Sequence, residues 1–190
     1  FASLAVLIFQ FFRESQIKAT IISILVIIVI GFAGFNYSPL FKNRIQQVSY
    51  DIALLTTNPN TSIGHRMVFA SNTLEVIKTS PIIGVGTGDF PSEYTKVNIK
   101  NTPAVKSTVQ PHNMYLFIQA QLGLIGIISF LWIFYVQFQI AYSAKNQFIH
   151  HAGIALPFLF LIIMLSDTYL LGHFTSNLFI LFSSFIYSRQ

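Results

Sequence analysis

The sequence predicts an all-α fold: a polytopic membrane protein in which a bundle of transmembrane helices carries one large outer loop with short helices in it. Two observations predict this fold class. The 190 residues are 53% hydrophobic and only 9% charged, with a mean hydropathy of +0.63, whereas soluble domains contain about 25% charged residues. The apolar residues also gather in long runs, as spanning helices require.

The composition also excludes several classes of function. The formal net charge is +5, but the 11 Lys and Arg residues are dispersed along the chain. No basic run exists, so we expect no nucleic-acid partner. Cysteine is absent, which excludes disulfides, thiolate metal sites and a cysteine nucleophile. The few separated histidines and acids have no metal-ligand spacing, and we therefore expect no metal or other cofactor.

Four apolar segments follow one another along the chain. Residues 1–12 are too short for a full span of about 20 residues, and we expect them to be the tail of a span that begins earlier in a larger protein. Residues 19–35 form a second, short span. Residues 114–144 form a third span. Residues 152–187 are long enough for two more, with a break near Gly172–His173.

The basic residues of the short connections predict the topology. Short loops rich in Lys and Arg stay on the cytoplasmic side. We therefore expect residues 1–35 to hold transmembrane spans, 36–113 to form the outer loop domain, and 114–190 to hold about three further spans. The residues that set this orientation are Arg13, Lys18, Lys145 and Arg189.

Within the outer segment, helical spacing of apolar residues predicts two helices, 42–55 and 62–79. Thr61 or Ser62 is placed to cap the second helix, and Pro81 ends it. Residues 95–110 are polar and predict an exposed loop. The apolar stripe expected for the first helix is Ile45, Val48, Ile52 and Leu55, and for the second Ile63, Met67, Ala70, Leu74 and Ile77.

His112 is the first candidate for chemistry because it lies where the polar loop meets the third span. Histidine titrates near neutral pH and is the commonest acid–base side chain in enzymes. The alternative is an interfacial residue that ends a loop. Asp167 is an acid within the last apolar block, which favours a function, although near the outer end of a span it can simply reach water.

Arg66 and Arg44 are candidates for binding phosphate, since a guanidinium donates two parallel hydrogen bonds. Arg66 begins the 62–79 helix, where a solvated charge is the alternative. Arg44 lies just outside the second span, where it can instead snorkel to lipid headgroups, an interpretation that predicts tolerance to Lys. The glycines of residues 84–90 suit either a backbone nest for phosphate, including Gly86, or a tight turn back to the membrane.

Together these residues resemble the C-terminal half of the bacterial O-antigen ligase and polymerase superfamily. The resemblance covers about residues 40–130 and depends on the order of its motifs. An arginine after a span is followed by His-Arg at a helix start, then by the glycine-rich segment, and then by Pro-His-Asn-Met-Tyr-Leu at the start of the next span. The matching residues are Arg44, His65–Arg66, 80–90, 111–116 and Gln121-Leu122-Gly123-Leu124-Ile125-Gly126.

The resemblance implies a metal-independent glycosyltransferase of the bacterial inner membrane, with its large loop in the periplasm. Such enzymes transfer a glycan from undecaprenyl pyrophosphate to an acceptor hydroxyl. In ligases the acceptor is the lipid A core, in polymerases another lipid-linked repeat unit, and in related enzymes a protein. We expect the ligase activity, with the lipid-linked glycan, the acceptor and membrane lipids as partners.

For individual residues, the resemblance implies that Arg66 and Arg44 bind the pyrophosphate and stabilise its charge as it leaves. It implies that His112 activates the acceptor hydroxyl or holds it for attack. Asn113 and Tyr115 are expected to contact substrate or to position His112. A non-enzymatic alternative, a transporter or lipid-binding protein, predicts charged residues along the spans, and only Asp167 meets that description.

Overall fold

The computed structural model describes residues 16–53 and 61–188, and all of its regular elements are helices. The all-α class is thus confirmed for the described residues. The chain divides into two compact units, Phe1–Ala53 and Leu54–Gln190, which are considered separately. The partial span expected at residues 1–12 lies outside the described residues.

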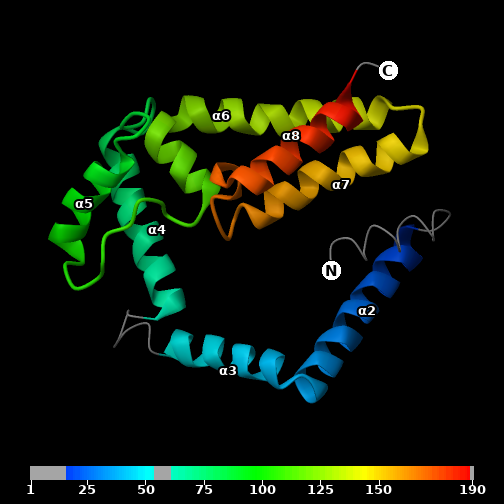
Figure 1. Ribbon diagram of the computed structural model, residues 1–190, viewed down its shortest axis with the longest axis horizontal. Helices are drawn as coiled ribbons and strands as arrows, with labels where there is room; N and C mark the ends of the chain where they lie inside the picture. The colour runs from blue at the N-terminus through cyan, green and yellow to red at the C-terminus, as the bar shows by residue number, and fades with distance from the viewer. Residues whose placement is uncertain (1–15, 54–60, 189–190) are drawn as a thin grey trace. The chain divides into compact units, whose positions relative to one another are not determined.

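The first unit consists of two consecutive helices, α2 (Gln16–Tyr37) and α3 (Pro39–Ala53) (Figure 1). Pro39 begins α3, the position where a missing backbone N–H costs least. Helix α2 contains the second predicted span and is long and apolar enough to cross a membrane. Helix α3 contains the predicted 42–55 helix up to Ala53, since Leu55 lies outside the described residues. Its expected apolar stripe is exposed within this unit, at Ile45, Val48 and Ile52.

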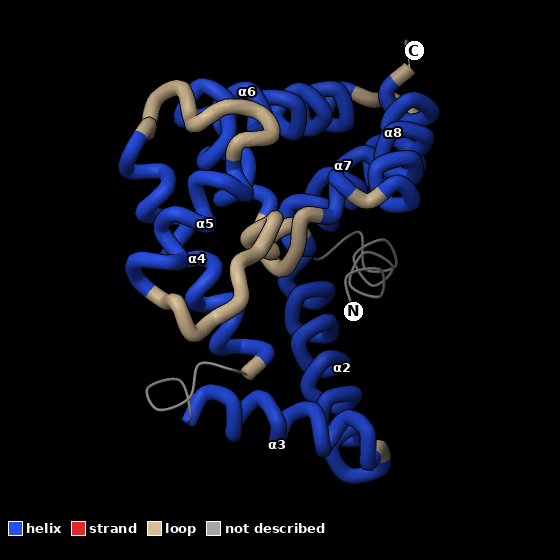
Figure 2. Tube along the Cα trace, turned by 60° about the vertical axis from the view of Figure 1, so that its left-hand side comes forward, coloured by secondary structure: helices blue, strands red, loops and turns tan. Residues whose placement is uncertain are grey.

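The second unit joins a small helical layer to a bundle. Helices α4 (Ser62–Thr79) and α5 (Phe90–Asn101) pack against each other and against the first part of α6 (Met114–Ser143). Helices α6, α7 (Gln147–Ile163) and α8 (His173–Tyr187) lie side by side, as Figures 1 and 2 show. A short 3-10 helix, η1 (Tyr169–Leu171), precedes α8.

Helix α4 has the predicted bounds, and Thr61 caps it by accepting a hydrogen bond from the Gly64 amide at 3.0 Å. The predicted apolar stripe is not the face that packs, however. Of its members only Ile77 is buried, and Met67 and Leu74 are about half exposed. The face that packs contains polar side chains with internal partners, so the pattern of apolar residues indicated the wrong side. The buried residues of α4 are Gly64, Asn72, Thr73, Val76 and Ile77.

The exposed loop predicted at 95–110 is wrong in its first part, because residues 95–101 belong to helix α5, whereas residues 102–110 lie outside the helices as predicted. Pro91 lies in its first turn, where proline fits. Phe90, Tyr94 and Asn98 are spaced four residues apart and are all buried, so they form one helix face. The lysines on the opposite face made the segment read as polar throughout.

The third predicted span corresponds to α6, but Gly123 interrupts this helix with φ of 65° and ψ of −160°. The segment that follows α4 pairs with the interruption. The amides of Val85 and Gly86 donate to the carbonyls of Ala120 and Gln121 at 2.9 and 3.0 Å, and the Leu124 amide donates to the Pro81 carbonyl at 2.9 Å. The glycine-rich segment is thus a tight turn held against α6, and the part of α6 after Gly123 is still about 20 residues long, enough to span a bilayer.

The segment predicted to hold the last two spans contains two shorter helices. Helix α8 starts at the expected His173 and has 15 residues, whereas α7 ends earlier, at Ile163, and has 17 residues. Pro157 lies inside α7 and cannot donate to the carbonyl four residues before it. That carbonyl belongs to Gly153, and the Tyr187 hydroxyl of α8 donates to it at 2.6 Å. The proline therefore frees a backbone group that ties the two helices together.

We expect Gly123→Ala and Gly84→Ala to destabilise the protein. A Cβ at either position lies within 2.3 Å of the paired backbone, and both glycines have positive φ. The left-handed conformation costs roughly 1–2 kcal/mol and overpacking roughly 1–3 kcal/mol more. Gly88→Ala is the control, because its φ is also positive but nothing lies within 4 Å of the added carbon. In detergent, the midpoint temperature of thermal unfolding should be clearly higher for Gly88→Ala than for the other two variants. Equal midpoint temperatures would contradict the close pairing between the turn after α4 and the interruption in α6.

Candidate functional site

The candidate site is built around His112, in the segment that leads into α6. His112 has φ of 52°, and among the described residues it alone combines positive φ with a side chain. Such a conformation is uncommon for a residue with a Cβ and is kept only when its surroundings impose it. Asn113 then starts α6 by accepting a hydrogen bond from the Leu116 amide at 3.0 Å.

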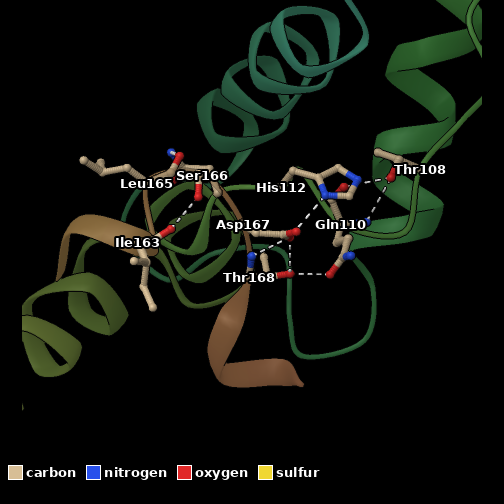
Figure 3. A network of polar contacts seen from close by, with 9 residues as sticks. Thr108, Gln110, His112, Ile163, Leu165, Ser166, Asp167 and Thr168 are labelled. Atoms are coloured by element: carbon tan, nitrogen blue, oxygen red, sulfur yellow. Dashed lines mark hydrogen bonds and ion pairs between the residues drawn. The ribbon is translucent and has the colours of Figure 1, made fainter. Parts of the chain in front are cut away.

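A carboxylate holds the imidazole from one edge. His112 Nδ1 lies 3.1 Å from Asp167 Oδ1 (Figure 3). An ionised carboxylate only accepts hydrogen bonds, so Nδ1 is the donor in this contact and Nε2 is left as the acceptor. Both side chains are about one-third exposed. The geometry is that of a histidine whose free nitrogen can take a proton from a group arriving from solvent.

Asp167 is itself fixed in place. Its Oδ1 accepts a hydrogen bond from the Thr168 amide at 2.7 Å, and the Thr168 hydroxyl donates to the side-chain oxygen of Gln110. Figure 3 shows these contacts as a chain that runs from His112 through Asp167 and Thr168 to Gln110. The carboxylate therefore cannot turn away from the imidazole without breaking other bonds.

The same two chain segments are joined at several further points. The Asn113 side chain donates to the Leu165 carbonyl at 3.0 Å, and the Met114 amide to the Met164 carbonyl at 3.0 Å. The Tyr115 hydroxyl donates to the Leu161 carbonyl at 2.6 Å. These carbonyls come from the end of α7, where helices leave acceptors unpaired. The start of α6 thus caps α7 and sets the distance between His112 and Asp167.

Helix α4 covers one face of the imidazole. The rings of Phe69 and His112 stack with their centres 5.9 Å apart and their planes 24° apart, and His65 stacks on Phe69 at 5.8 Å. Phe69 also meets the edge of Tyr94 at 6.2 Å. His112 is therefore held at one edge by a carboxylate and on one face by an aromatic ring.

A buried polar network positions Tyr94. The side-chain amide of Asn72 donates to the Tyr94 hydroxyl at 3.3 Å, to Asn98 Oδ1 at 3.3 Å and to the Thr102 hydroxyl at 2.7 Å. Burial raises the pKa of Tyr94 above its ordinary value, more than the hydrogen bond from Asn72 lowers it. The hydroxyl is therefore neutral at physiological pH and suited to a packed interior.

Arg66 lies one turn before Phe69 on α4, and its side chain is exposed. Residues three apart are neighbours on a helix surface, so Arg66 and Phe69 lie next to each other on α4. Arg66 forms no ion pair with an acid in the described part of the chain. No described acid therefore competes with an anionic ligand for this guanidinium.

The other two predicted residues have hydrogen bonds of their own. Arg44 belongs to the first unit, where it is exposed and donates to Gln47 Oε1 at 3.3 Å. The Gly86 amide is used by the Gln121 carbonyl, at the opposite end of the first segment of α6 from His112. Within the described ranges, no three His, Cys, Asp or Glu residues are grouped as metal ligands would be.

Sequence reasoning missed three parts of the site. It considered Asp167 only as an isolated acid, and it did not single out Phe69 or Gln110. The intramembrane acid was the available signal for Asp167, but its partner lies 55 positions earlier. Phe69 was hidden because apolar residues of a helix are usually core, and no pattern pairs its ring with His112.

Two comparisons relate the chain to known proteins. Residues 1–131 match the family described as O-antigen ligase. The match includes the predicted residues Arg44, Arg66 and His112 but ends before Asp167. The chain is also 32% identical over 147 residues to an uncharacterized protein of Haemophilus influenzae, a match that covers 74% of this chain and 36% of the relative. The chain therefore spans about a third of that relative's length.

We expect Asp167→Asn to change the imidazole's protonated nitrogen. An amide can donate as well as accept, so the preference for a proton on Nδ1 should fall. Histidine ¹⁵N shifts measured on neutral His112 would report this, with Ser166→Ala as the control because the Ser166 hydroxyl bonds only to the Ile163 carbonyl. An unchanged tautomer in Asp167→Asn would show that the carboxylate does not orient the ring.

Proposed function

This chain belongs to the O-antigen ligase family, and we propose on that premise that it forms part of a membrane glycosyltransferase. The proposed reaction moves a glycan from undecaprenyl pyrophosphate to an acceptor hydroxyl, with the lipid A core as the acceptor. The observation that carries the proposal is the imidazole of His112, whose Nδ1 lies 3.1 Å from Asp167 Oδ1. Arg66 lies one helical turn before Phe69, the residue whose ring stacks on that imidazole.

In the proposed step, the acceptor hydroxyl attacks the anomeric carbon of the donor sugar. Its proton passes to His112 Nε2 as the new carbon–oxygen bond forms. Asp167 then stabilises the imidazolium. The bond between the sugar and the pyrophosphate breaks, and the leaving group keeps the bonding electrons. General-base help of this kind is typically worth about 10²–10⁴-fold.

The arginines have a separate role in the proposal. Negative charge grows on the pyrophosphate as it leaves, and guanidinium groups aimed at it lower the barrier. Arg66 is proposed to bind it beside the imidazole. Arg44 is proposed as a second ligand of the pyrophosphate, on the resemblance alone.

Two of the predicted substrate contacts take a different role in the proposal. Both polar atoms of the Asn113 side chain and the Tyr115 hydroxyl are bonded within the protein. We therefore assign Asn113 and Tyr115 to positioning His112 through the junction between α6 and α7. Substrate binding by Gly86 stays a prediction.

The same unit supports a proposed placement in the membrane. Helix α6 is long and apolar enough to cross a membrane, and His112 lies before its start while Lys145 follows its end. If the short loop with Lys145 is cytoplasmic, then His112 faces the periplasm of a bacterial inner membrane. A lipid-linked donor would present its sugar at that depth.

We expect His112→Ala and Arg66→Ala to abolish glycan transfer, because they remove the base and the cation at the leaving group. Arg66→Lys should recover little activity, since an ammonium cannot donate two parallel hydrogen bonds. The assay is cell-surface glycan in a null strain that carries the full-length protein, with membrane insertion checked by immunoblot.

His173→Ala and Lys96→Ala are the matched controls for these variants. His173 begins α8 at the same end of the bundle, and Lys96 lies on α5 and pairs with Glu93 at 2.6 Å. Both variants should keep normal transfer. Normal transfer by His112→Ala and Arg66→Ala would refute the mechanism.

The acceptor is tested by the glycan that accumulates in a knockout strain. We expect long chains to remain on the lipid carrier, because a missing ligase leaves completed polymers without an acceptor. Mass analysis of the carrier-linked fraction measures this. Single repeats on the carrier would instead identify a polymerase, and an unchanged lipopolysaccharide with an unglycosylated protein would identify a protein O-oligosaccharyltransferase.

A further inference from the structure

The turn that follows α4 exposes two large apolar side chains. Ile82 is 61% exposed and Ile83 is 69% exposed. No charged residue occurs between Lys78 and Asp89, so no charged side chain holds this segment in water. We call residues 81–84 the isoleucine turn.

Backbone hydrogen bonds fix the level of the isoleucine turn along α6. The Leu124 amide donates to the Pro81 carbonyl at 2.9 Å, and the Ile125 amide donates to the Ile82 carbonyl at 3.3 Å. These amides belong to the first residues of the long segment of α6 after Gly123. The turn is therefore attached where the candidate span begins.

Exposed apolar side chains lie on both of the segments that these hydrogen bonds join. The start of the long segment of α6 exposes Leu124 at 49%, Ile125 at 59% and Ile128 at 57%. Soluble surfaces commonly carry apolar side chains singly, but neighbouring ones indicate an interaction site. The isoleucine turn extends the apolar surface of the span sideways by two side chains.

We propose that the isoleucine turn inserts into the bilayer, at the boundary between headgroups and acyl chains. This inference rests on the proposed membrane placement of α6. The occupant is lipid because the turn continues a surface that lipid would cover, and because Lys78, whose side chain is 70% exposed, can reach the headgroups beside it. The insertion holds the end of α4 at the membrane surface and so fixes the height of the helix that carries Arg66 and Phe69.

Ile99 provides an internal comparison. It is 66% exposed, as much as the two isoleucines of the turn, but it lies on α5 close to Lys96 and Lys100. It has no apolar span beside it. Ile99 is a single exposed residue in water, so its environment should differ from that of Ile83 although the residue type and the exposure match.

Site-specific fluorescence tests the insertion directly. These 190 residues contain no cysteine, so single cysteines can be introduced without background once any others in the full-length protein are replaced. Ile83→Cys, Ile99→Cys and Ile133→Cys would be labelled with an environment-sensitive dye. The protein is then placed in phosphatidylglycerol and phosphatidylethanolamine nanodiscs that contain spin-labelled lipids. Ile133 lies in the middle of the long segment of α6 and is 51% exposed.

The expected result is a blue-shifted label at Ile83 that is quenched by lipids labelled near the headgroup. The label at Ile99 should be quenched by aqueous iodide instead, and the label at Ile133 by lipids labelled deep in the acyl chain. If the label at Ile83 behaves like that at Ile99 while the label at Ile133 is quenched by lipid, the proposed insertion of the isoleucine turn is wrong and the membrane placement of α6 stands. If the label at Ile133 is not quenched by lipid either, the membrane placement of α6 is also wrong. Ile82→Cys serves as the second site should Ile83→Cys elute as an aggregate.

Discussion

The contact between His112 and Asp167 is the constraint on which the rest of the site depends. It joins residues 55 positions apart, one before α6 and one after α7. Neither helix places its residue alone: the positive φ of His112 directs the ring, and the end of α7 supplies the acid. The start of α6 donates hydrogen bonds to the free carbonyls of α7 at the same junction. The same bonds therefore cap α7 and align His112 with Asp167.

The small helical layer of α4 and α5 has a second role in this arrangement. Its buried network around Asn72 holds Tyr94, which contacts Phe69, which in turn stacks on His112. A buried polar network specifies one geometry only when its members are satisfied, and here one amide has three partners. The packed core of this layer therefore restricts the position of the His112 ring. Helix α4 of the same layer also carries Arg66.

The sequence predicted the elements whose signals are local. The spans within α2 and α6 follow from apolar length, and the bounds of α4 follow from the Thr61 cap and from Pro81. It failed where partners are distant. The interior face of α4 is polar because Asn72 finds its partners 22 to 30 positions later, and α5 was mistaken for a loop because its buried face includes Asn98. The interruption at Gly123 depends on a second segment that pairs with it.

For the site, residue type and order indicated His112 and Arg66, whereas the pairing of His112 with Asp167 exists only in three dimensions.

A double-mutant comparison tests the central claim, that Asp167 acts through His112. Transfer would be measured with the purified full-length protein over long incubations, so that residual rates can be resolved. Asp167→Asn should lower transfer in the parent protein by up to the about 10²–10⁴-fold that general-base help is typically worth. In the His112→Ala background the same substitution should change the residual rate little, because the effects of coupled residues do not add. An equal fold-loss from Asp167→Asn in both backgrounds would show that the carboxylate acts independently and would contradict the account.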